Sequence, residues 1–174
     1  MIRLILGIAF LLLLFACQPT VIQDAPQPTK VTVLEGIAHP WSMAFVDEDE
    51  VIISEKDRGL LRANLQTKQV DRIDNFPLDL ADSIRAYHFG DNSGVFEVLV
   101  DPSFSENQWI YVSYAARDTL GMATKVVRAK LTGTTISEME TLLVASPFTF
   151  ERYHYGGGMT FGPDGKLYIT IGER

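Results

Sequence analysis

The stretch "HYGGGMTFGPDGKLYITIGER", residues 154–174, contains the pattern that decides the fold. An apolar strand, a turn at Pro163-Asp164-Gly165 and a second apolar strand follow one another. The same order occurs earlier in the chain around Asp47 and around Asp101-Pro102. Residues 47, 102 and 163 take equivalent places in these copies and are 55 and 61 residues apart. A strand-turn-strand unit that recurs at such a spacing predicts a β-propeller, with insertions in its later strands and loops.

Each copy begins with an apolar strand, a turn and a second apolar strand, and continues with a variable loop and a polar-faced strand. In the first copy the apolar patterns predict strands at 31–37, 41–46 and 51–55, and two more within 58–73. A solenoid would need a tighter and more uniform spacing, and an immunoglobulin-like sandwich would not explain the recurrence.

The third copy stops after its second strand. We therefore expect an all-β, incomplete β-propeller of about two and a half blades of four-stranded antiparallel sheets, belonging to a longer protein. Because a propeller buries its sheet edges by closing, we also expect exposed strand edges.

The composition supports a packed core and argues against nucleic acid as a partner. The chain has 174 residues, of which 47% are hydrophobic and 21% are charged. Its formal net charge is −7, and its lysines and arginines form no basic stripe that could displace counterions from a phosphate backbone.

The first 17 residues, "MIRLILGIAFLLLLFAC", predict a signal peptide, because Arg3 precedes an apolar run too short to span a bilayer. The run ends in Leu-Phe-Ala-Cys, which resembles the lipobox of bacterial lipoproteins, so Cys17 is the expected lipidation site. The alternative is an ordinary secretory signal in which Cys17 is incidental. Gln18, where an aspartate would favour the inner membrane, indicates the periplasmic side of the outer membrane; the alternative location is the soluble periplasm.

Residues 18–30 carry three prolines without apolar periodicity and predict a tether to the membrane, followed by a folded domain over 31–174. Cys17 is the only cysteine, so the domain has no disulfide or cysteine-based metal site.

His154 is the strongest catalytic candidate among His39, His88 and His154. Three glycines, 156–158, follow it closely, and the absence of side chains there would let a planar ligand or another backbone approach. In a propeller the starts of the innermost strands converge on the central channel, where a neutral histidine is a competent general base. The alternative for any one of these histidines is a surface or core residue whose nitrogens are satisfied.

Asp91 and Asn92 precede the inner strand of the second copy and could contact a ligand in the same channel. The alternative is simple turn chemistry, since "GDNSG" suits any tight connection. The sequence contains no nucleophile elbow, Walker loop, dinucleotide fingerprint or His-Glu-x-x-His, and "GPDGKLYITIG" lacks the acidic spacing of an EF-hand.

Three stretches carry a family resemblance: "HPWSMAF" with "VIISEKDRGLLRAN", then "GVFEVLVDPSFSENQWIYVSYA", then "HYGGGMTFGPDGKLYITIGER". Together they resemble the soluble quinoprotein sugar dehydrogenases of the glucose/sorbosone dehydrogenase family, and most of all its aldose sugar dehydrogenase branch. The resemblance runs from Val31 to Arg174. It implies a six-bladed β-propeller that holds pyrroloquinoline quinone (PQQ) over its central channel, with calcium on the quinone.

The resemblance also implies roles for individual residues. His154 matches the general base that takes the proton of the anomeric hydroxyl while a hydride moves to the quinone, so that aldoses become lactones. Electrons would then pass to a respiratory acceptor. Asn92 stands where a glutamine touches PQQ in the glucose-specific branch; the other candidate cofactor contacts are Asp91, Tyr153, Tyr155 and Gly157.

Several positions depart from the family pattern. Tyr153 replaces an aspartate or asparagine, and Gly158 stands where many members have an arginine. The calcium ligands and the arginine and lysine contacts to PQQ would lie beyond Arg174, so no metal ligand is expected within this chain, and the chain alone is expected to be inactive.

Two other functions remain open. One is a propeller lipoprotein without cofactor that binds carbohydrate or protein, which the substituted Tyr153 favours. The other is a calcium-dependent lactonase-type propeller, for which Asp91 and Asn92 could supply ligands.

Overall fold

The computed structural model describes residues 28–77 and 92–173. The chain divides into two units, Met1–Val31 and Thr32–Arg174, and the described residues of the first have no regular secondary structure. The expected signal peptide with Cys17, most of the tether, His88 and Asp91 lie outside the described residues. Within residues 28–77 and 92–173, no helix is long and apolar enough to cross a membrane.

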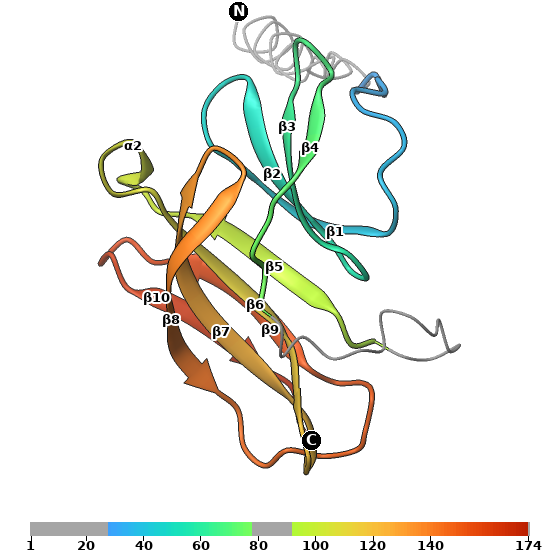
Figure 1. Ribbon diagram of the computed structural model, residues 1–174, viewed down its shortest axis with the longest axis vertical. Coiled ribbons are helices and arrows are strands. Elements are labelled where there is room, and N and C mark those ends of the chain that lie inside the picture. The colour runs from blue at the N-terminus through green and yellow to red at the C-terminus, as the bar shows by residue number, and fades with distance from the viewer. Residues whose placement is uncertain (1–27, 78–91, 174) are drawn as a thin grey trace, which may run out of the picture. The chain divides into compact units, whose positions relative to one another are not determined.

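The second unit is nearly all β and is built from three antiparallel sheets (Figure 1). Two have four strands in sequence order and the third, as described, has two. This arrangement confirms the prediction of an open, incomplete β-propeller. The first sheet contains β1 (Pro40–Phe45), β2 (Glu50–Glu55), β3 (Gly59–Asn64) and β4 (Val70–Arg72); the second contains β5 (Val95–Val100), β6 (Trp109–Asp118), β7 (Gly121–Thr132) and β8 (Thr135–Val144); the third contains β9 (Gly156–Phe161) and β10 (Leu167–Ile171).

The prediction of a strand over residues 31–37 was wrong, because this segment joins no sheet. Its apolar residues Leu34 and Ile37 pack instead on the side chains of Val51 and Ile53 in β2. The apolar alternation therefore reflects packing on a sheet face rather than strand pairing. A one-turn helix, α2 (Phe104–Asn107), occupies a segment that the sequence predicts as a polar loop.

The three predicted turns are present, and each one contains an aspartate whose side-chain Oδ1 accepts hydrogen bonds from backbone N–H groups one to three residues further on. These bonds hold the loop between the first two strands of each repeat. The donors are Asp49 and Glu50 for Asp47 (2.8 Å each), Ser103 for Asp101 (2.9 Å) and Lys166 for Asp164 (3.1 Å).

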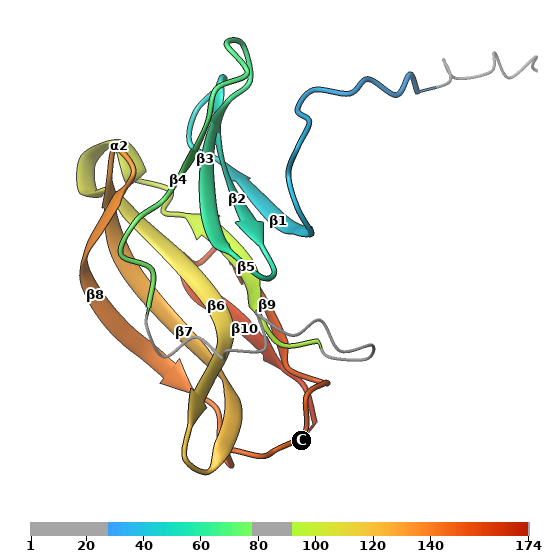
Figure 2. The same ribbon diagram turned by 45° about the vertical axis from the view of Figure 1, so that its right-hand side comes forward.

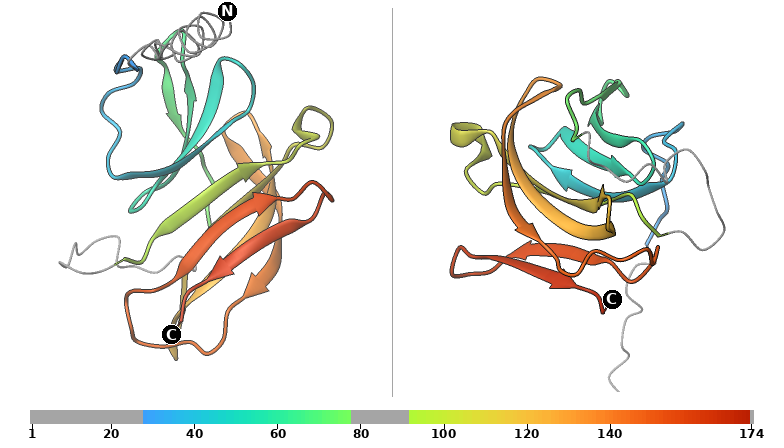
Figure 3. Two further views of the ribbon diagram at one scale, coloured as in Figure 1. Left: turned by 180° about the vertical axis from the view of Figure 1, so that it is seen from behind. Right: turned by 60° about the horizontal axis from the view of Figure 1, so that its bottom comes forward.

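The innermost strands of the three sheets, β1, β5 and β9, lie beside one another (Figures 2 and 3). A buried hydroxyl from each sheet's second strand joins it to the next inner strand. Ser54 of β2 donates to the carbonyl oxygen of Phe96 at 2.7 Å, and Ser113 of β6 donates to that of Gly157 at 2.5 Å. Both serines are fully buried, so these bonds fix where β9, and with it the segment around His154, begins.

Replacing Ser113 with alanine is expected to lower the free energy of unfolding by about 1–3 kcal/mol, the cost of leaving buried polar groups without a partner. Those groups are the Gly157 carbonyl and the Glu97 N–H, which donates to the Ser113 hydroxyl at 3.0 Å. Urea denaturation measures the change. The exposed Ser137 provides the matched control, and equal effects of the two alanine substitutions would contradict the proposed importance of the junction.

Two hydrophobic clusters fill the space between the sheets. The larger lies between the first and second sheets and includes Ile52, Leu60, Val95, Ile110 and Tyr114. The smaller consists of Phe96, Ala115, Met122 and Tyr155 and lies where β9 begins. Burying this apolar surface is the main favourable term that holds the sheets together.

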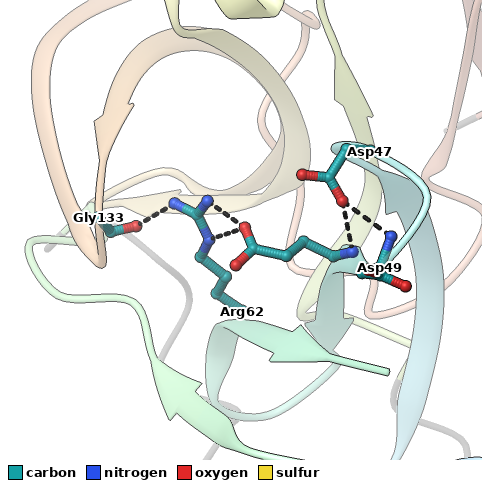
Figure 4. Close-up of polar contacts among 5 residues, drawn as sticks. Asp47, Asp49, Arg62 and Gly133 are labelled. Carbon is teal, nitrogen blue, oxygen red and sulfur yellow. Dashed lines mark hydrogen bonds and ion pairs between the residues drawn. The ribbon is translucent and has the colours of Figure 1, made fainter. Parts of the chain in front are cut away.

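A polar clasp also links the first two sheets (Figure 4). The Arg62 guanidinium on β3 donates from Nε to Glu50 at 2.9 Å and from Nη1 to the carbonyl oxygen of Gly133, in the β7–β8 turn, at 2.8 Å. Nearby, the Asp74 N–H donates to the Thr134 carbonyl at 2.8 Å. The second β-hairpin is thereby fastened to the first blade.

The first sheet keeps an apolar groove open, with a volume of about 380 Å³. Trp41, Met43 and Phe45 of β1 line it, together with Leu34 and Ile37. The three β1 side chains are each more than half exposed. The exposed edge and face expected from the sequence therefore occur at β1.

Candidate active site

His154 lies two residues before β9, and its Nδ1 is 2.7 Å from Oε1 of Glu173, two residues after β10. The antiparallel pairing of β9 and β10 brings the start of one strand next to the end of the other. The imidazole is 58% exposed. If Nδ1 carries the proton and donates it to the carboxylate, Nε2 keeps a lone pair and can accept another proton.

A cavity of about 310 Å³ adjoins this pair, and its described lining residues are Glu151, Tyr153, His154 and Glu173. The rings of Tyr153 and His154 meet edge to face, with centroids 5.3 Å apart. The Tyr153 hydroxyl hydrogen-bonds the Glu151 carboxylate, and this bond and the negative charge of Glu151 raise the pKa of Tyr153 above its ordinary value. The cavity thus combines an imidazole, a phenol and two carboxylates.

Asn92 is exposed and is held beside this segment by the main chain. Its backbone N–H donates to the carbonyl oxygen of Arg152 at 2.7 Å. The segment that leads into β5 therefore meets the segment that leads into β9, as expected if both begin at a shared channel. Asp91, the other ligand candidate there, lies outside the described residues.

Tyr155 and Gly157 face the core rather than the cavity. The Tyr155 ring is 3% exposed and packs on Phe96 at a centroid distance of 5.2 Å. A Cβ at Gly157 would lie 2.7 Å from Cδ2 of Phe96. Both residues support the start of β9 in this structure, and a contact of either with a cofactor stays a prediction.

The glycines after His154 have a packing role that the sequence left open. Gly156 has φ +71°, and a Cβ there would lie 2.6 Å from the backbone N of Gly172. A Cβ at Gly172 would lie 2.0 Å from the carbonyl oxygen of His154. Of the two partners that the sequence suggested for the glycine run, a ligand or another backbone, the structure shows a backbone at Gly156.

The first blade contains the same arrangement of imidazole and carboxylate. His39 lies directly before β1, and its Nδ1 is 2.5 Å from Oδ2 of Asp57, two residues after β2. Sequence reasoning missed the carboxylate partners of both histidines. A signal was present, because Asp57 follows Phe45 and Glu173 follows Phe161 by 12 residues, at equivalent places of the repeat.

Glu151 was also missed, because no pattern in the sequence pairs it with Tyr153. The described residues contain no cluster of three or more His, Cys, Asp or Glu side chains arranged to hold a metal ion.

Comparison with known proteins agrees with the fold and the resemblance. The family model for "Glucose / Sorbosone dehydrogenase" matches residues 37–174. "Aldose sugar dehydrogenase YliI" of Escherichia coli strain K12 is 26% identical over 170 residues, which cover 95% of this chain and 44% of that protein. "Quinoprotein glucose dehydrogenase B" of Acinetobacter calcoaceticus is 21% identical over 154 residues, covering 83% of this chain and 30% of that protein.

A solved glucose dehydrogenase structure superimposes with a TM-score of 0.73 at 26% identity, covering 84% of this chain and 41% of that one. The chain spans less than half the length of these relatives. The family match covers most of the sequence, including both β9 and the histidine before it. The chain belongs to the glucose/sorbosone dehydrogenase family.

Proposed function

We propose that the protein containing this chain is a PQQ-dependent aldose sugar dehydrogenase in which His154 is the general base. The observation that carries the proposal is the exposed imidazole of His154, oriented by Glu173 at an open cavity. Membership of the family, and relatives named as an aldose sugar dehydrogenase and a quinoprotein glucose dehydrogenase, support the reaction class.

The described residues fit one side of a site for a quinone and a sugar. The cavity at His154 is open, and the neutral side chain of Asn92 is exposed on the neighbouring segment. Asn92 and Tyr153 are the residues of this chain that would face PQQ. When bound, PQQ supplies the two-electron acceptor for the hydride on the anomeric carbon of the sugar.

His154 performs the proton transfer in this proposal. Glu173 accepts the hydrogen bond from Nδ1 and so fixes the tautomer in which Nε2 is the basic nitrogen. Nε2 then takes the proton from the anomeric hydroxyl as the carbon–hydrogen bond breaks. The imidazolium that forms is stabilised by the Glu173 carboxylate beside it.

Calcium as a further cofactor, a respiratory electron acceptor and a lipid anchor at Cys17 belong to the same proposal. The anchor would place the protein on the periplasmic side of the outer membrane. These points rest on the sequence and the family resemblance.

Dye reduction tests the proposal. The protein is expressed from its complete gene, loaded with PQQ and calcium, and given glucose and other aldoses with an artificial electron acceptor. We expect dye reduction that requires both the sugar and PQQ. Sugar binding without dye reduction would identify a binding protein, and lactone hydrolysis without PQQ would identify a lactonase; either result would overturn the proposal.

A further inference from the structure

The cavity at His154 contains a second pair of ring and carboxylate that the proposed reaction does not use. His154 is bonded to Glu173, and Tyr153 is bonded in the same way to Glu151. The two rings touch edge to face, and all four side chains line the same cavity of about 310 Å³. The pair Glu151–Tyr153 is therefore positioned to contact whatever binds beside His154.

The hydrogen-bonding capacity left in this cavity is that of acceptors. The Tyr153 hydroxyl gives its proton to Glu151, so its remaining capacity is to accept, and a carboxylate only accepts. Two carboxylates also give the cavity a negative charge, and no lysine or arginine is among its described lining residues. Acceptors with negative charge suit a ligand that offers hydroxyl or ammonium donors.

We propose that Glu151 and Tyr153 form a sugar-recognition subsite that selects neutral and amino aldoses and rejects anionic ones, such as uronic acids and sugar phosphates. The neutral and cationic sugars offer donors to the carboxylate and the phenol oxygen. An anionic sugar brings a like charge next to Glu151 and Glu173, which costs free energy on binding. This inference rests on the proposed function, because it names the substrate class of that site.

Replacing Glu151 with glutamine removes the charge and keeps the shape. In the PQQ-loaded protein we expect the kcat/KM ratio of glucuronate to glucose to rise about fivefold, the effect of roughly 1 kcal/mol between charges near a surface. The ratio of protonated glucosamine to glucose should fall by a similar factor. Both changes should shrink at high ionic strength because salt screens exposed charges.

Glu48, an exposed residue of the loop between β1 and β2, provides the matched control. E48Q makes the same change in net charge and should leave both ratios unchanged. Ratios that do not move in E151Q, or that move equally in E48Q, would overturn the subsite.

A second measurement does not depend on catalysis. Ultraviolet titration of the chain follows the phenols, and Y153F identifies the contribution of Tyr153. E151Q should lower the pKa of Tyr153, because it removes the negative charge that now raises it. An unchanged titration would show that the two side chains are not paired in solution and would overturn the subsite.

Direct binding separates failure of the subsite from failure of the proposed function. If no aldose reduces the dye, the proposed function fails, and calorimetry with glucose, glucosamine and glucuronate still judges the subsite. Tighter binding of the neutral and amino sugars, lost in E151Q, would support it. Equal binding of all three sugars would overturn it.

Discussion

Replacing His154 with alanine is expected to lower kcat for aldose oxidation by about 10²–10⁴-fold, the range that a positioned general base contributes. The substitution removes the acceptor for the hydroxyl proton and leaves Glu173 too far back in the pair to replace it, because the carboxylate contacts only the other side of the ring. The measurement is PQQ-dependent dye reduction at saturating sugar.

His39 is a matched control for this experiment within the same chain. It occupies the equivalent place in the first blade, has a carboxylate on Nδ1 and is 58% exposed, as His154 is. His39→Ala should leave kcat nearly unchanged, and both variants should unfold at similar urea concentrations. A His154→Ala protein that keeps its activity, or equal losses in the two variants, would remove His154 from the role of base.

Replacing Gly94 with alanine is expected to lower the free energy of unfolding by about 3–4 kcal/mol, from the sum of backbone strain, a steric clash and a lost hydrogen bond. Gly94 has φ +138°, and a Cβ there would lie 2.3 Å from the carbonyl oxygen of Lys56. That carbonyl accepts a hydrogen bond from the Val95 N–H at 3.0 Å, which joins β5 to the first blade. Urea denaturation followed by tryptophan fluorescence measures the loss.

Gly165 separates the clash from the strain. It also has a positive φ, +74°, but a Cβ there would meet no atom within 4 Å. Gly165→Ala should therefore cost only about 1–2 kcal/mol, the price of the left-handed conformation for alanine. Equal costs at the two glycines would show that the approach of Lys56 to Gly94 does not limit stability.

The repeat made the fold predictable from the sequence, because each blade repeats the same local order of strand, turn and strand. Asp47, Asp101 and Asp164 form their turns through bonds to residues close in sequence, and such local chemistry is readable without a structure. The error at residues 31–37 has the opposite origin. An apolar alternation shows which side chains are buried, but it does not show whether the backbone has a strand to pair with.

The candidate site was predictable only in part. The position of His154 before three glycines is a local signal, and the structure places this histidine at an open cavity. Its partner Glu173 is brought to it by the pairing of β9 with β10, so the contact depends on register and not on sequence distance. Gly157 illustrates the same limit, because the atoms that exclude a side chain there belong to Phe96 of the second blade.

The open groove beside Trp41, Met43 and Phe45 has a consequence for biosynthesis. A ring of blades closes when its first sheet meets its last, and the first sheet is the earliest to leave the ribosome. Until closure, three large apolar side chains remain available to any other nascent chain, which is the condition under which holdase chaperones are needed. The order of synthesis therefore makes the oldest blade the most vulnerable to aggregation and the last to be protected.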